Sequence, residues 1–184
     1  VEESIDCLEG SGPADLMEVT YRLGAWMLVA GGKAKDIDEG ARACERAIES
    51  GKALELFMDN VRRQGGDAER MAALRGAWRS PHSYELRAPA AGYVAGIDAY
   101  KIGLAGVNLG VGRNKTTDPV YPDVGLVFEK KVGDVVAPGD RICSVYGKDE
   151  ESLAASRPLV EAAIGYSERR AAARPLVIEE LSAL

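Results

Sequence analysis

The sequence predicts an α+β protein in two parts, a helical segment over residues 1–80 and a C-terminal α+β subdomain over residues 81–184. Apolar residues recur at helical spacing through the first eighty positions, whereas the later region is rich in Val, Ile, Phe and Tyr. The proline-containing stretch "RSPHSYELRAP" separates the two patterns. A chain of 184 residues is long enough to bury a core.

The first clear helix lies within "GSGPADLMEVTYRLGAWMLVAGG". Pro13 suits the start of a helix, and Asp15 lies where the helix dipole favours a carboxylate. The pair Gly31-Gly32 ends it. We expect one apolar face to pack in the core, formed by Leu16, Val19, Leu23, Trp26 and Ala30.

Three more helices follow in the first part. One begins at Asp36, with Glu39 three residues later as in a capping box, and closes at Gly51. The next is stopped by "QGGD", and a short last one carries Met71, Leu74 and Trp78. The apolar stripes of the first two are expected in the core: Ile37, Ala41, Cys44 and Ile48, then Leu54, Phe57, Met58 and Val61.

The second part begins with a strand. Alternation over residues 84–87 predicts it, and the Val-rich stretches "AGYVAGID" and "VGLVFEKKVGDVVAPGDRICSVYG" predict others. Pro138-Gly139 fits a type II turn, since Pro presets the first corner and Gly accepts a positive φ at the second. Residues 150–173 are expected to be helical, with Pro158 starting a new helix or kinking the first. "RPLVIEEL" at the end is expected to form one short strand.

Composition excludes several classes of protein. The net charge of −6 argues against nonspecific nucleic-acid binding, and no apolar run is long enough to span a membrane. The three cysteines are widely spaced without a CxxC pair, and the chain has one His, so a Cys/His zinc site is not expected. We expect reduced thiols in a cytoplasmic protein. The opening "VEESIDCLEG" has no initiating Met and is typical of mid-helix, so we expect a piece of a larger protein.

The stretch "LAGVNLGVGRNKTTDP" at 104–119 is the main candidate for ligand binding. Its glycines match neither a P-loop nor the dinucleotide fingerprint. Together with Arg113, Lys101 and Lys115 it could still fold over an anionic ligand. The pattern alone leaves two alternatives open, a ligand lid and an ordinary flexible surface loop.

Two other side chains are candidates for chemistry. His82 could act as a general base, but no nucleophile or carboxylate accompanies it in a known motif, so a surface His at a domain boundary is favoured. Glu3 could ligate a cation through its carboxylate, although a solvated helix face is the simpler interpretation.

A carrier module is the principal alternative to an enzyme. "RAPAAGYVAGI" followed by "KKVGDVVAPGDRI" resembles biotinyl and lipoyl carrier domains, in which a Lys on a hairpin tip holds the cofactor. Lys148 is the nearest candidate, but the Met-Lys-Met or Asp-Lys-Ala tip is absent and Lys148 runs directly into a helix. An independent binding protein that adopted the fold is a third possibility.

Several stretches together resemble the C-terminal part of the pyrimidine nucleoside phosphorylases, which include thymidine phosphorylase. The resemblance implies that residues 1–80 end a central α/β domain and that residues 81–184 form a barrel-like, barrel-sandwich hybrid subdomain. It covers nearly the whole chain and is carried by "GSGPADLMEVTYRLGAWMLVAGGKA", "AIESGKALELF", "QGGD", "AAGYVAGIDAYKIG" and "LGVGRNKTTDPVYPDVGLVFEKKVGDVVAPGDRICSVYG".

The resemblance implies reversible phosphorolysis of a pyrimidine nucleoside to free base and a pentose 1-phosphate. Inorganic phosphate is then a co-substrate, and no organic cofactor is needed. The family's catalytic residues lie N-terminal to Val1, so we expect none in this chain and no activity from it alone. The complete enzyme is expected to be a cytoplasmic homodimer in pyrimidine salvage that binds neither nucleic acid nor membrane, while this piece alone is monomeric. Thymidine-specific and broader pyrimidine specificity both stay open.

Two residues acquire roles from the same resemblance. Glu3 matches a Glu that, with backbone carbonyls, holds a monovalent cation such as K⁺. Arg113 lies at the centre of a loop that orders over the cleft when ligands bind. The resemblance therefore implies that this loop caps a closed site, while the phosphate is bound elsewhere.

Overall fold

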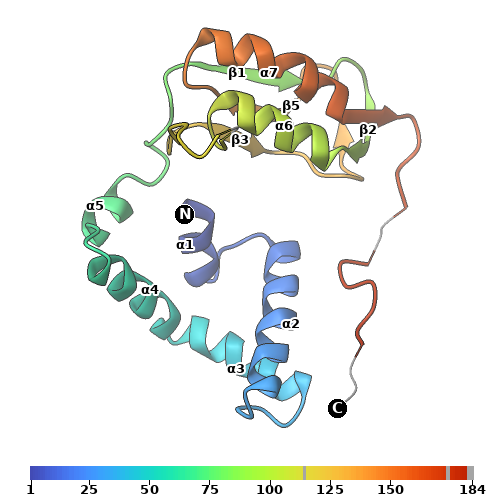
Figure 1. Cartoon of the computed structure of the whole chain (residues 1–184). Helices are drawn as coiled ribbons and strands as arrows, with labels where there is room; N and C mark the ends of the chain where they lie inside the picture. The colour runs from blue at the N-terminus through green and yellow to red at the C-terminus, as the bar shows by residue number, and fades with distance from the viewer. Residues whose placement is uncertain (114, 173–174, 182–184) are drawn as a thin grey trace. The chain divides into compact units, whose positions relative to one another are not determined.

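The computed structural model describes residues 1–113, 115–172 and 175–181. The chain divides into two compact units (Figure 1). The first comprises Val1–Ala77 and Arg174–Leu184, and the second comprises Trp78–Ala173.

The first unit is helical, as the sequence predicts. The Asp36 carboxylate accepts a hydrogen bond from the backbone N of Glu39 (2.8 Å), so the expected N-cap is present. The Glu39 carboxylate accepts from the backbone N of Lys35 (2.9 Å), one residue before the Asp36 amide that a capping box would use. The short last helix ends at Ala73, so Trp78 lies outside it, contrary to the prediction. The helices are α1 (Glu2–Leu8), α2 (Ala14–Ala30), α3 (Ile37–Glu49), α4 (Lys52–Arg63) and α5 (Ala68–Ala73).

Helices α2 and α3 approach each other closely because small residues line their contact. A Cβ added to Gly40 would lie 2.8 Å from the Cα of Ala25, and one added to Gly24 would lie 2.7 Å from the Sγ of Cys44. Ala25 is fully buried in this contact. The absence of side chains at both glycines therefore sets the distance between the helices.

The predicted core face of α2 is wrong for this unit. Leu16 and Leu23 are exposed, as is Met27, whereas Met17 and Ala25 are buried. The physical reason is that α3 packs on the side of α2 that carries the small residues, which leaves the larger apolar side chains on the opposite side.

The second unit contains two antiparallel three-stranded sheets with strand orders β1-β5-β3 and β4-β2-β6. Helices α6 and α7 lie side by side in this unit (Figure 1). The α+β class is therefore confirmed, and the described strands form no closed barrel. The elements are β1 (Ser83–Arg87), β2 (Gly92–Ile97), α6 (Ala99–Leu109), β3 (Gly125–Phe128), β4 (Val135–Val136), β5 (Arg141–Tyr146), α7 (Glu150–Ala163) and β6 (Ile164–Ser167).

The turn at Pro138-Gly139 has the predicted character. Gly139 has a φ of +86°, and the backbone N of Asp140 donates to the carbonyl of Ala137 (3.0 Å). These contacts join the end of β4 to the start of β5.

Two other predictions near the C-terminus are wrong. Residues 164–167 form strand β6, not a continuation of the helix, because Ile164 turns to extended backbone and the segment pairs with β2. Residues 175–181 form no strand, since no sheet edge is paired with them. Pro158 lies inside α7 without ending it.

The core of the second unit consists of two apolar clusters. The thiol of Cys143, on β5, is fully buried, and this burial raises its pKa to about 12. All three cysteines, Cys7, Cys44 and Cys143, are free thiols. The first cluster contains Ala88, Val94, Val136, Ile142, Ala163 and Ile164, and the second contains Ala105, Leu109, Cys143, Val145, Leu153 and Val160.

Tyr84→Phe is expected to stabilise the protein by about 1 kcal/mol. Within the described part of the chain, the buried Tyr84 hydroxyl has no hydrogen-bond partner, and burial raises its pKa to about 12. The Arg157 guanidinium lies 3.9 Å from the ring centroid, a contact that Phe retains. Urea unfolding measures the change, with Tyr84→Leu as a destabilised control that lacks the ring. A loss of stability in Tyr84→Phe would mean that the hydroxyl has a partner, such as a bound water.

Candidate functional site

The candidate loop begins later than the sequence predicts. Residues 104–109 belong to α6, which ends at Gly110, where a φ of +109° requires glycine. The chain then doubles back, and the backbone N of Tyr121 donates to the carbonyl of Gly110 (3.1 Å). A Cβ on Gly110 would lie 2.9 Å from the Tyr121 ring. The contact of Gly110 with the Tyr121 ring thus closes the base of the loop over residues 110–124. Residue 114 of this loop lies outside the described residues.

Lys148 joins the base of this loop to the connection between β5 and α7. Its backbone N donates to the carbonyl of Leu109 (3.1 Å), and its ammonium lies 6.0 Å from the centroid of the Tyr121 ring. Lys148 therefore lies between a strand and a helix, as expected, and not on the hairpin tip that a carrier lysine occupies.

Arg113 lies in the same loop, three residues after Gly110. It is exposed, and its Nη1 donates to the carbonyl of Thr116 at 3.4 Å, a long hydrogen bond. Lys115 and Asp118 close a turn next to it, since the backbone N of Lys115 donates to the Asp118 carboxylate (2.8 Å). A guanidinium has five N–H donors, so Arg113 retains donors for an anion.

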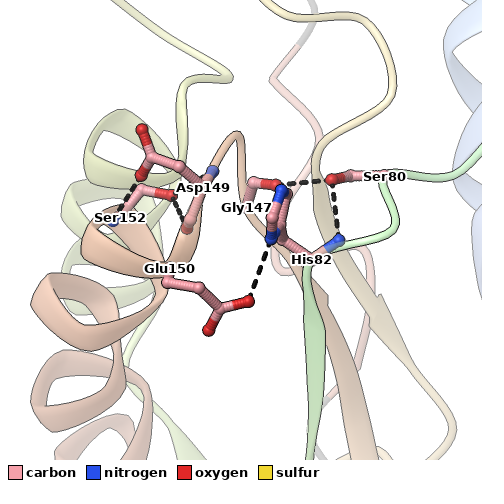
Figure 2. A network of polar contacts seen from close by, with 6 residues as sticks. All are labelled: Ser80, His82, Gly147, Asp149, Glu150 and Ser152. Carbon is pink, nitrogen blue, oxygen red and sulfur yellow. Dashed lines mark hydrogen bonds and ion pairs between the residues drawn. The ribbon is translucent and has the colours of Figure 1, made fainter.

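A network of polar contacts holds the connection between β5 and α7 to the segment before β1 (Figure 2). The buried Ser80 hydroxyl donates to the carbonyl of Gly147 (2.6 Å) and accepts from the backbone N of His82 (3.2 Å). The backbone N of Gly147 donates to the carbonyl of His82 (3.0 Å). Apart from the Ser80 hydroxyl, the bonded groups are the backbone N–H and C=O of His82 and of Gly147. The network therefore fixes the position of the chain immediately before Lys148.

The start of α7 is capped within the same network (Figure 2). The Asp149 carboxylate accepts from the backbone N of Ser152 (2.8 Å), and the Ser152 hydroxyl accepts from the backbone N of Asp149 (3.2 Å). This capping box satisfies amides that the first helical turn leaves without partners. The hydrogen bond from the Ser152 amide is also the main cause that lowers the pKa of Asp149.

Ser80, His82 and Glu150 have the residue types of a hydrolase triad but not its geometry. The His82 Nδ1 lies 2.9 Å from a Glu150 carboxylate oxygen, while the Ser80 hydroxyl bonds to the backbone of Gly147 and His82 and not to the His82 ring (Figure 2). A triad needs its imidazole to take the proton of the serine hydroxyl. The cluster is therefore structural. The sequence pattern did not pair His82 with a carboxylate, because Glu150 is 68 residues away.

Glu3 lies exposed in the first turn of α1. Neighbouring carboxylates on this helix have partners: Glu2 accepts from the backbone N of Gly76 (2.8 Å), and Asp6 pairs with Arg75. Within residues 1–113, 115–172 and 175–181, no three His, Cys, Asp or Glu side chains form a group that could hold a metal ion. The monovalent-cation role of Glu3 stays a prediction.

A small hollow in the second unit is lined by aromatic and polar groups, including Trp78, Arg79, Asp123 and Tyr146. The Arg79 guanidinium lies 5.8 Å from the centroid of the Tyr146 ring. The volume of the hollow, about 110 Å³, is below the several hundred Å³ of typical ligand sites. This hollow does not enclose a nucleoside-sized ligand.

Comparison with known proteins identifies the family. Residues 93–167, from β2 to β6, match the family described as the pyrimidine nucleoside phosphorylase C-terminal domain. The pyrimidine-nucleoside phosphorylase of Bacillus subtilis is 37% identical over 150 residues, and that of Staphylococcus haemolyticus is 36% identical over 150 residues. The chain belongs to the pyrimidine nucleoside phosphorylase family. In each alignment the matched region is 82% of this chain and 35% of the relative, so the chain spans about a third of their length.

The region that matches the pyrimidine nucleoside phosphorylase C-terminal domain contains the whole candidate loop, Lys148 and α7. The pyrimidine-nucleoside phosphorylase of Staphylococcus aureus aligns over a similar length, with 34% identity over 151 residues. Of the helices that the structure describes, none has both the length and the apolar character needed to cross a bilayer.

Proposed function

We propose that this chain is the C-terminal part of an enzyme that cleaves the N-glycosidic bond of a pyrimidine nucleoside with inorganic phosphate. The products are the free base and a pentose 1-phosphate. The identity of 36–37% to pyrimidine-nucleoside phosphorylases across 82% of the chain carries this proposal. We propose that the catalytic residues belong to the part of such an enzyme that this chain does not span, and that the chain alone is inactive.

The proposed reaction needs charge stabilisation and the exclusion of water. Negative charge develops on the leaving base while positive charge grows on the sugar, so polar groups around both must be arranged beforehand. Water in the site would compete with phosphate for the sugar carbon. A loop that closes over bound ligands excludes water from the site. A cation on such a loop can also help to stabilise the developing negative charge.

The loop over residues 110–124 is the part of this chain that fits such a role. Its base is fixed by the contacts of Gly110 with Tyr121 and of Lys148 with Leu109. The polar network at Gly147 in turn fixes the chain before Lys148. An anchored base with the exposed Arg113 beyond it supports a lid that presents a guanidinium to an anionic ligand.

In the complete enzyme, Arg113→Ala is expected to lower kcat/KM by about ten- to a hundredfold, because a charge-assisted contact made in the closed state is lost. The melting temperature should stay the same, since Arg113 is exposed. Steady-state phosphorolysis of thymidine and uridine measures the effect and also tests the substrate range. Lys115→Ala, in the same loop, is the matched control and should change kcat/KM less. An unchanged kcat/KM in Arg113→Ala would contradict the lid role.

The remaining features are proposed from the family resemblance. We propose that Glu3 contributes to a monovalent-cation site completed by residues outside this chain, and that the complete enzyme is a cytoplasmic homodimer in pyrimidine salvage. The two open sheets of the second unit are proposed to belong to a barrel-sandwich arrangement. Incubation with biotin or lipoate ligase tests the carrier alternative, for which mass spectrometry would find an adduct on Lys148.

A further inference from the structure

The Glu180 carboxylate attaches the C-terminal segment, residues 175–181, to helix α2. One oxygen of Glu180 accepts a hydrogen bond from the indole Nε1 of Trp26 (2.9 Å), and the other pairs with the guanidinium Nε of Arg22. Arg22 and Trp26 are four residues apart on α2, so both donors project from the same face. The Glu180 side chain is only 23% exposed, and partial removal from water strengthens charge-assisted hydrogen bonds.

Apolar burial contributes little to holding this segment in place. Most of its apolar side chains face solvent: Leu176 is 46% exposed, Ile178 is 89% exposed and Leu181 is 84% exposed, while Val177 is partly buried. Residues 175–181 also form no helix or strand. The contacts of Glu180 are therefore the strongest attachment that the structure describes for this segment.

We propose that Arg22 and Trp26 form a two-donor carboxylate socket that makes residues 175–181 a strap across α2. The chain leaves the first unit after Ala77 and rejoins it with the segment Arg174–Leu184. When Glu180 occupies the socket, the second unit is tethered to the first at both of its ends. Closing a chain at both ends removes conformational freedom, so the strap restricts the independent motion of the second unit.

The test compares Glu180→Gln with Glu179→Gln in the 184-residue chain carrying Trp78→Phe, which leaves Trp26 as the single tryptophan. Gln at position 180 keeps the shape of the side chain but loses the charged bond to Arg22. Cleavage of residues 175–181 by a nonspecific protease is expected to be about tenfold faster or more in Glu180→Gln, with greater acrylamide quenching of Trp26. Glu179→Gln should match the parent, because Glu179 is an exposed neighbour outside the socket.

Two further measurements separate the strap from a general loss of stability. In a double-mutant cycle, Arg22→Gln and Glu180→Gln should be non-additive, since each removes the same contact. ¹⁵N relaxation should show faster independent tumbling of residues 78–173 in Glu180→Gln but not in Glu179→Gln. Equal cleavage rates in the two Glu variants would overturn the proposal. So would additivity in the cycle, or an equal loss of hydrogen-exchange protection throughout helices α2–α4.

Discussion

Gly40→Ala is expected to lower the free energy of unfolding of the helical unit by about 2–3 kcal/mol. The new Cβ would lie 2.8 Å from the Cα of Ala25 and 2.9 Å from its carbonyl oxygen. These are backbone atoms, which cannot rotate away, so α2 and α3 must separate and lose contacts along their length. Urea denaturation, with hydrogen exchange resolved for α2 and α3, measures the loss.

Gly103→Ala is the matched control for this prediction. Gly103 is also inside a helix, but it is exposed and a Cβ there would meet no atom within 4 Å. Ala is favoured over Gly in a helix interior, so Gly103→Ala is expected to raise the free energy of unfolding of its own unit, the second, by about 1 kcal/mol. Stability in Gly40→Ala equal to or above that of the parent would contradict the close packing of α2 on α3.

Gly147→Ala is expected to destabilise the second unit by about 2–3 kcal/mol and to displace the start of α7. Its Cβ would lie 2.6 Å from the Ser152 hydroxyl and 2.8 Å from Cδ2 of Leu153. Neither side chain moves without cost, because Ser152 completes the cap of α7 and Leu153 belongs to the buried core. Thermal unfolding and hydrogen exchange of residues 147–156 measure the two effects.

Gly96→Ala tests whether the effect depends on the position of Gly147. Gly96 lies in strand β2 of the same unit, and a Cβ there would meet nothing within 4 Å. We expect a change within about 0.5 kcal/mol. Equal stability of the Gly147 and Gly96 variants would show that α7 tolerates a side chain at the junction.

Features encoded by neighbouring residues could be predicted from the sequence. The cap at Asp36, the end of α2 at Gly31-Gly32 and the turn at Pro138-Gly139 each depend on side chains within a few positions. Features that depend on distant partners could not. The buried face of α2 is decided by the close approach of α3 to Gly24 and Ala25, and the helix predicted past Ala163 gives way to strand pairing with β2.

The candidate site shows the same division. The loop around Arg113 was found from its glycines and cations, because these are consecutive in the sequence. Its first residues were misassigned, since Leu104–Leu109 complete α6. The contacts of His82 with Glu150 and of Ser80 with Gly147 join positions 67 or 68 residues apart, which no local motif reports.

The buried thiol on β5 provides a built-in reporter of opening. An alkylating reagent needs a thiolate that it can reach, and Cys143 is both inaccessible and protonated at neutral pH. Modification of Cys143 therefore records how often the second unit opens, whereas the partly exposed Cys7 and Cys44 of the first unit can react without any opening. Peptide-resolved alkylation kinetics would thus time the opening around Cys143 without any added label, with the two other thiols as accessible references.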